Sequence, residues 1–341
     1  MSPRTATALL ALAFTPLVLA FQPRADSIQL SAKDGTKLSK ELAISGTFTM
    51  EGGTASVMGE EQEIPAEDEP LELDMTLEVT DEYSKVADGR AVELLRTFDG
   101  MAMEYGAGEE GGEVDEFTEL EGSTVKFVRG EEGRYEKSFH EEEGEETLLT
   151  GLEADMDFVA LLPEKEVSPD DTWKASGANL KTVFLPGGVP LGAGSDDENV
   201  GTVVRDLLIP MIEDGAGDFA IECTYKGVRE DDEQRIAEIA LEFEGMVSGE
   251  ASELVLSIAE VMGEGEGAPE DLSADAEIEF SGEGTLLWNV EGGHVHSYEC
   301  AVSTDIILML DFSQDMGGGD MEINFEAEFS GDVEWALSVA E

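Results

Sequence analysis

Three histidines and two cysteines are the side chains of this chain best suited to bind a transition metal or to act as nucleophiles. His294 and His296 lie two residues apart in a strand-like segment, in line with Cys300, and metal sites use this spacing. The two histidines also adjoin a turn at Gly292 and Gly293, where half-exposed histidines need no ligand. We therefore expect no metal site at these residues.

Three other motifs are incomplete or badly placed for their chemistry. His140 and Glu141 begin like a zinc-protease helix, but the second histidine is missing. Residues 106–111 have the glycine spacing of a dinucleotide-binding loop, yet their glutamates would repel a pyrophosphate. Ser123 and Lys126 match S-x-x-K, but a strand pattern puts them on opposite faces. We expect no catalytic residue and no cofactor.

The cysteines lie in two alternating segments, FAIECTYKG with Cys223 and HVHSYECAVS with Cys300. In each segment the cysteine shares a face with apolar residues, so both thiols are predicted to point inward. In an oxidising compartment they can form a disulfide if their strands are adjacent or face each other. Otherwise they are two buried free thiols, and the sequence leaves both alternatives open.

Residues 1–20 predict a secretory signal peptide. Arg4 precedes an apolar run, residues 8–20, that is too short to span a bilayer and ends in small residues. No cysteine follows this run, so acylation as a lipoprotein is not expected. No later apolar run is long enough to cross a membrane. We expect an exported protein, periplasmic or extracellular, that does not span the membrane.

Strict alternation of apolar and polar residues dominates the rest of the chain and predicts antiparallel strands with one wet face. The longest pattern covers residues 321–339, and similar patterns cover 234–247, 251–262, 275–289 and 294–310. Shorter strands are expected in the N-terminal part. We divide the chain into an N-terminal β region (21–149), a helix-containing segment (150–214) and a C-terminal β meander (215–341), the first and last in one sheet.

Two capping-box patterns in the central segment predict helices. The first follows Thr150 and runs to Pro163, and the second follows Ser195 and runs to Pro210. Each predicted helix has one apolar stripe that must be buried. The expected fold is mainly β (α+β), a long-stranded curved antiparallel sheet with both helices packed on its concave face.

The phrase Glu-Phe-x-Gly occurs on three predicted strands and ends at Gly245, Gly282 and Gly331. A glycine inside a strand often marks a bulge or a bend. We interpret these glycines as bends that let long strands coil.

The formal charge is −60, which argues against nucleic acid as a partner because phosphates are bound by clustered cations. Residues 236–341 contain 26 acidic residues and no lysine or arginine. Facing carboxylates on neighbouring strands repel each other. This composition favours a surface adapted to salt; weak association with divalent cations or a cationic partner is the alternative.

One stretch resembles a known family. Leu162 and Pro163, then Val167, then an Asp-x-Trp pattern that ends at Trp173, precede a later glycine-rich hairpin that ends at the 292–293 turn. The stretch resembles an uncharacterised family of exported bacterial, planctomycete-type, β-rich proteins. That resemblance implies export and a β-rich fold, and it implies no activity.

We expect a non-catalytic exported acidic protein that binds an apolar ligand or an envelope partner. Long bent strands with helices across them are typical of carriers for apolar molecules, an argument from fold alone. The alternative is a secreted hydrolase that uses paired carboxylates, which requires two acids of different pKa in one cleft.

Overall fold

The structure is a computed structural model that describes residues 25–57, 59–66, 69–107, 110–113, 120–131, 133–141, 144–176, 180–188, 220–231, 234–252, 272–315 and 320–340. The predicted signal peptide, residues 1–20, lies outside the described residues.

Strands account for most of the described chain. They are β1 (Thr36–Val57), β2 (Glu60–Ile64), β3 (Leu71–Ala87), β4 (Arg90–Ala107), β5 (Glu110–Glu113), β6 (Thr124–Arg129), β7 (Tyr135–Phe139), β8 (Thr172–Ser176), β9 (Ala220–Asp231), β10 (Gln234–Glu250), β11 (Ser273–Asn289), β12 (His294–Asp315) and β13 (Asp320–Ala340). The helical segments are short: η2 (Glu146–Leu149), η3 (Val159–Leu161) and α1 (Leu180–Phe184).

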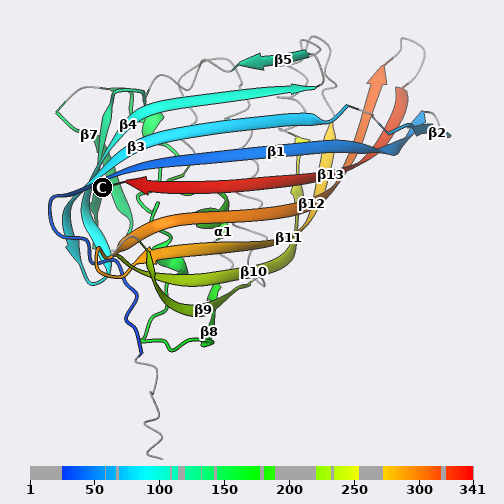
Figure 1. The fold of residues 1–341 in the computed structure, drawn as a ribbon. Coiled ribbons are helices and arrows are strands. Elements are labelled where there is room, and N and C mark those ends of the chain that lie inside the picture. The colour runs from blue at the N-terminus through cyan, green and yellow to red at the C-terminus, as the bar shows by residue number, and fades with distance from the viewer. Residues whose placement is uncertain are drawn as a thin grey trace, which may run out of the picture.

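These strands form one antiparallel sheet (Figure 1). Its order is β7-β6-β4-β3-β1-β13-β12-β11-β10-β9-β8, with β2 paired to β1 and β5 to β4. Because β1 pairs with β13 over almost its whole length, the N-terminal and C-terminal strands belong to the same sheet. Among the described strands β7 and β8 are the two ends of this order, so the sheet does not close.

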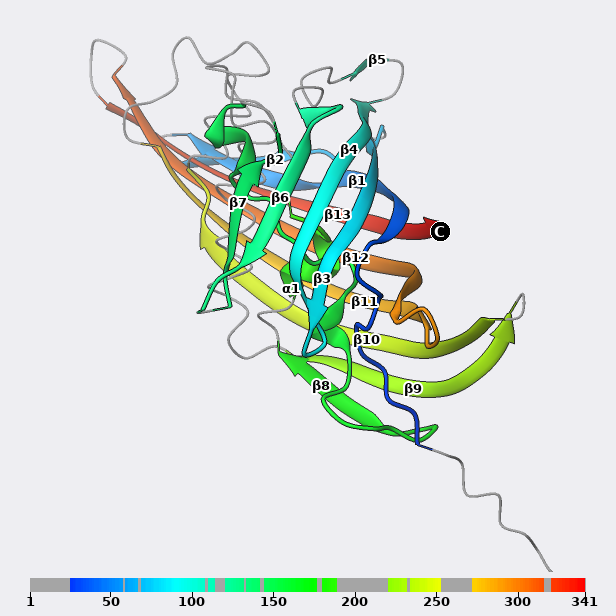
Figure 2. The same ribbon diagram turned by 90° about the vertical axis from the view of Figure 1, so that its left-hand side faces the viewer.

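The sheet curves around the central part of the chain, as Figure 2 shows. We call residues 144–163 and 180–188 the plug, and the sheet face that it contacts the inner face. Tyr298 on β12 donates a hydrogen bond to the Val183 carbonyl, and Trp335 on β13 donates one to the Phe184 carbonyl. Buried side chains alternate with exposed ones along the long strands. The predicted long-stranded, curved antiparallel sheet is confirmed.

The helix predicted over residues 150–162 is wrong. Only η3 forms there, as a single turn. Arg96 on β4 donates hydrogen bonds to the carbonyl oxygens of Glu153 and Ala154, at 2.9 and 3.2 Å, which a helix would use itself. The Asp155 carboxylate accepts backbone N–H groups of the next turn, a local competitor of helical bonding. The buried apolar residues are therefore held by a folded loop.

The second predicted helix, residues 195–209, lies outside the described residues. Helix α1 forms in the central segment at a place where the sequence did not indicate a helix. It packs on the inner face through Phe184, whose ring contacts Phe243, Phe280 and Trp335. No helix in the described ranges combines the length and the apolar character that crossing a membrane requires.

The glycines of the repeated phrase make room for aromatic rings. No register shift occurs at Gly245, Gly282 or Gly331 in their strand pairs, so these positions are not bulges. A Cβ atom at Gly331 would lie 2.4 Å from the ring of Phe48, and one at Gly282 would lie 2.6 Å from the ring of Phe243. Atoms of these two rings therefore occupy the space that a side chain at the glycine of the neighbouring strand would need.

Candidate functional site

A buried ion cluster joins the sheet to the plug. Asp81 on β3 accepts Arg96 Nε at 2.7 Å and Lys40 Nζ at 2.9 Å. Lys40 also lies 3.1 Å from the Asp157 carboxylate of the plug, and Tyr83 donates a hydrogen bond to that carboxylate. The side chains of Lys40, Asp81 and Arg96 are almost fully buried. Since each charge has an opposite charge in contact, the cluster can exist without water.

Burial and neighbouring charges set the pKa values in the cluster. Burial alone would raise the pKa of Asp81, but the charges of Arg96 and Lys40 outweigh it and lower the pKa to about 2. Burial, followed by the charge of Asp157, raises the pKa of Asp155. Both Asp155 oxygens already accept backbone N–H groups. These acids are enclosed and bonded within the chain, so they do not form the open carboxylate pair that a hydrolase requires.

This cluster was not predicted, although the sequence contains a signal for it. Lys40, Asp81 and Arg96 each occupy a position where the strand alternation calls for an apolar residue. Their neighbours two positions away on each side are buried: Leu38, Leu42, Val79, Tyr83, Leu94 and Phe98. Two cations and one acid at inward positions of neighbouring strands indicate a buried ion pair network.

Away from the ion cluster, the inner face carries a set of half-buried apolar side chains. On β12, every second residue after Tyr298 faces the inner side, and the strand register carries this face onto β11, β13 and β1. We call the half-buried set the inner apolar surface. It comprises Met50, Ile278, Ile306, Leu308, Leu310, Phe325 and Phe329.

The inner apolar surface begins where the contacts of the plug end. Within the described residues, Phe158 of the plug stacks on Tyr298 at 4.0 Å, and Phe184 of the plug reaches as far as Phe280. The next inward pair along β11 and β12 is Ile278 with Ile306. The described contacts of the plug therefore extend along the inner face as far as Phe280, and the inner apolar surface continues beyond them.

Cys223 and Cys300 lie in one row of the sheet but on different strands. Cys223 on β9 pairs with Leu241, Leu241 with Gly284, and Gly284 with Cys300 on β12. Three strand spacings amount to roughly 14 Å, beyond the reach of a disulfide. Of the two alternatives, the structure has the two buried free thiols. Burial raises the pKa of Cys223 to about 12 and that of Cys300 to about 11.

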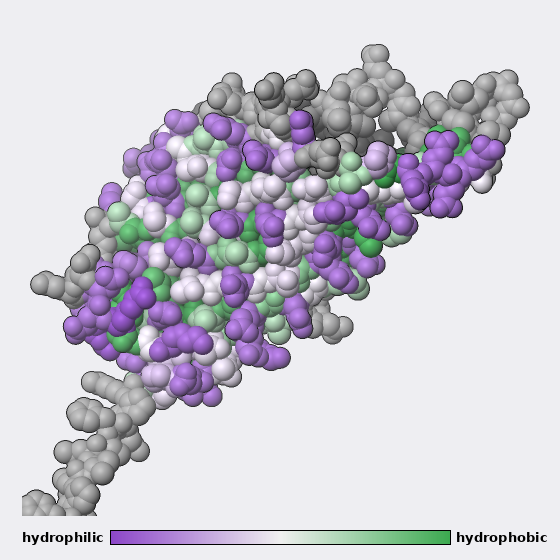
Figure 3. Space-filling view, turned by 45° about the vertical axis from the view of Figure 1, so that its right-hand side comes forward, coloured by the Kyte–Doolittle hydropathy of each residue, from purple (hydrophilic) through white to green (hydrophobic). Residues whose placement is uncertain are grey.

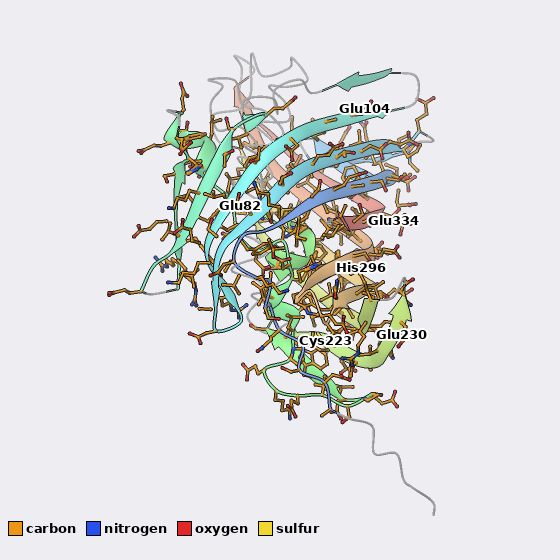
Figure 4. The ribbon with its side chains drawn as sticks, turned by 60° about the vertical axis from the view of Figure 1, so that its left-hand side comes forward. Glu82, Glu104, Cys223, Glu230, His296 and Glu334 are labelled. Carbon is orange, nitrogen blue, oxygen red and sulfur yellow. The ribbon has the colours of Figure 1, made fainter. Side chains whose placement is uncertain are left out.

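The histidines do not assemble a metal site in the described part of the chain. His294 is buried, and its Nδ1 lies 2.7 Å from the Val295 carbonyl. His296, labelled in Figure 4, is half-buried, and His140 lies on the strand-end turn near Glu141. Among the described residues no group of three or more histidines, cysteines or acids could hold a metal ion.

Hydrophilic residues are spread among neutral and apolar ones on the face of the molecule seen in Figure 3. On the outer face of the sheet, carboxylates of neighbouring strands lie opposite one another. Glu242 on β10 lies directly opposite Glu222 on β9 and Glu283 on β11. An open depression of about 640 Å³ on this face is lined by Glu242, Glu283, Glu299 and Glu334, with small residues between them. Figure 4 shows Glu334 and Glu104 on this outer side of the long strands. The acidic composition is thus concentrated away from the apolar interior.

Comparisons with known proteins establish no family. No family model and no curated protein matches the chain. A solved structure of lipovitellin, described for its lipid–protein interactions, aligns with 91% of this chain at 10% identity and a TM-score of 0.35. The chain spans only 26% of that lipovitellin chain. An outer-membrane channel from Pseudomonas putida F1 aligns over 92% of this chain and 98% of its own, at 7% identity and a TM-score of 0.19. Similarity at this level transfers no property.

Proposed function

We propose that this protein is an exported, non-catalytic binding protein that holds an elongated apolar ligand, such as an acyl chain, on its inner apolar surface. The observation that carries the proposal is the row of half-buried apolar side chains that continues the core beyond the plug. Neighbouring apolar side chains that remain partly accessible to solvent are unfavourable in water and can mark a binding site. Export rests on the signal-peptide pattern of residues 1–20.

The shape of this surface favours a long ligand over a compact one. It spans four neighbouring strands, and from Ile306 to Leu310 it extends along β12 for roughly 13 Å. The outer carboxylates keep such a complex dispersed in water.

Binding of the fluorescent fatty acid cis-parinaric acid tests the proposal. Leu308 belongs to the inner apolar surface, and the next residue, Met309, lies on the outer face of the same strand. We expect L308Q to weaken the affinity for the probe about tenfold, since an amide would be desolvated against the chain. M309Q introduces the same amide on the outer face and should bind like the wild type.

Two results would contradict this function. One is wild-type protein that leaves the fluorescence of cis-parinaric acid unchanged after bound lipid has been extracted. The other is equal weakening by L308Q and M309Q, which would indicate a general loss of stability. Native mass spectrometry before extraction shows whether an apolar molecule copurifies.

A further inference from the structure

A second concave site lies at the edge strand β8, away from the inner apolar surface. This cleft has a volume of about 720 Å³, within the range of small-molecule sites. One wall is β8 with Trp173, and the other is the loop after η3 with Leu162, Pro163 and Lys165. Arg90, which follows the β3–β4 turn, also lines it. In Figure 2 that turn reaches toward the end of the sheet that carries β8.

The walls of the cleft are fixed before any ligand binds. The indole N–H of Trp173 donates a hydrogen bond to the Leu161 carbonyl at 3.0 Å, which holds the ring in the wall. Val167, at the other end of the loop, exchanges two backbone hydrogen bonds with Asp26. Asp26 in turn accepts the hydroxyl of Tyr225 at 2.7 Å and Arg235 at 3.1 Å. The loop is thus anchored at both ends.

The lining of this cleft is richer in cations than the chain as a whole. Arg90, Lys165 and Lys174 line it, and none of the three forms an ion pair within the described residues. Two acids also line it, Glu164 and Asp171, but Asp171 already accepts the backbone N–H of Ser168 at 2.8 Å. Counted with Lys174 at the rim, three cations and two acids line the cleft, in a chain with 79 acids and 19 bases.

We propose that the cleft beside Trp173 binds a small amphipathic anion, with its apolar body against Trp173, Leu162 and Pro163 and its anionic head near Arg90 and Lys165. An indole ring with aliphatic neighbours provides a flat apolar wall, and its N–H is already used. Arg90 and Lys165 provide the donors and the positive charge that a carboxylate, sulfate or phosphate requires. Lys174 also lines the outer depression and belongs to the rim. This site is separate from the inner apolar surface.

Decanoate and decanol test the proposal because they share the apolar body and differ in charge. In about 0.15 M NaCl, which screens the long-range repulsion of the protein, decanoate should change the fluorescence of Trp173 with an affinity about tenfold higher than that of decanol. Trp288 is fully buried and Trp335 nearly so, and W173F should abolish the signal. L308Q alters the inner apolar surface and should leave the change in Trp173 fluorescence as in the wild type. The experiment therefore distinguishes failure of this proposal from failure of the proposed function.

Charge removal supplies the decisive comparison. K165Q and the double variant R90Q/K165Q should lower decanoate affinity stepwise, to about a tenth in the double variant, and leave decanol affinity unchanged. K33Q/K37Q removes two exposed cations outside the cleft and should bind decanoate like the wild type. Equal affinities for decanoate and decanol, or full decanoate affinity in K165Q and R90Q/K165Q, would overturn the proposal. Lys165 is exposed, so K165Q should fold normally even if the double variant does not.

Discussion

At the scale of single residues, the inner face combines apolar packing with a few charges that cannot be removed singly. Asp81 contacts both Arg96 and Lys40, and Arg96 also supplies hydrogen bonds to two plug carbonyls. Removal of one charged side chain leaves a buried opposite charge without a partner. This lowers the free energy of unfolding by more than the intact ion pair contributes to it. The cluster therefore fixes the position of the plug on the sheet.

Lys40 and Lys37 provide a matched test on one strand. Lys40 is buried against Asp81 and Asp157, whereas Lys37 makes an exposed pair with Glu82 at 2.9 Å. We expect K40M to lower the free energy of unfolding by about 3–5 kcal/mol and K37M by less than about 1 kcal/mol. Urea denaturation of the two variants measures both values. Equal effects would show that the buried cluster does not stabilise the plug.

The same cluster predicts a loss of stability in acid. The pKa of Asp81 is lowered from 3.8 to about 2 in the folded protein. Its contribution is therefore complete above pH 4 and disappears as the pH falls toward 2, by an amount on the order of 2 kcal/mol. The raised pKa of Asp155 acts in the opposite direction, because its protonation favours the folded state. Urea midpoints between pH 5 and 2 should fall in the wild type.

A pair of variants on β3 assigns the acid effect. D81N should lose the fall in midpoint between pH 4 and 2, because the group that titrates is gone. D74N removes an exposed carboxyl on the outer face of the same strand, and its urea midpoint should still fall between pH 4 and 2. A D81N variant with the wild-type pH dependence would assign the acid effect to other carboxyls.

At the scale of elements, the long strands depend on glycines that accept rings. We expect G331A to lower the free energy of unfolding by about 1–3 kcal/mol, since its Cβ would overlap the Phe48 ring. G100A is the control, because its Cβ would meet only ordinary contacts near Glu78 at 3.6 Å. Replacing the ring by a smaller side chain in F48L/G331A should recover part of the free energy of unfolding that G331A loses. Chemical denaturation of the wild type, G331A, F48L and F48L/G331A measures the coupling between the two positions.

The strands could be predicted from the sequence and the plug could not, for a physical reason. Side chains of a strand alternate between the two faces of the sheet, and one face of the long strands is buried. The alternation of apolar and polar residues in the sequence therefore shows which face is buried. Residues 150–162 have an equally good helical pattern, but their backbone groups are taken by Arg96 and Asp155, one of them 57 residues away in sequence. Hydrogen bonds from a residue so distant in sequence leave no periodic pattern in the segment itself, so the loop could not be distinguished from a helix. Lys40 and Asp81, by contrast, were visible as charges at inward positions.

At the scale of the whole molecule, the junction between β1 and β13 decides how the acidic C-terminal part is balanced. Cations from the N-terminal part could have faced its carboxylates across this junction. Instead, Glu334 lies opposite Ser45 and Asp332 opposite Thr47. The two lysines of β1 lie near its start: Lys37 pairs with Glu82 on β3, and Lys40 is buried. Hydroxyl groups thus take the places where ion pairs could have formed. Mobile cations from solution must provide most of the screening on this face.

The salt dependence of stability follows from this arrangement. Glu222, Glu242 and Glu283 face one another across three adjacent strands, and each like-charged pair is destabilising by a few tenths of a kcal/mol. The thermal midpoint should rise between about 10 mM and 1 M NaCl as the Debye length falls from about 30 to 3 Å. E242Q removes the central charge of the row, so it should raise the midpoint at low salt by roughly 1–3 °C and reduce the rise with salt. E93Q removes an acid that pairs with Lys126 at 2.8 Å and should show no such gain. A midpoint that is independent of salt in all three proteins would mean that the carboxylates are spaced widely enough to need no screening, and that the composition reflects solubility instead of a saline setting.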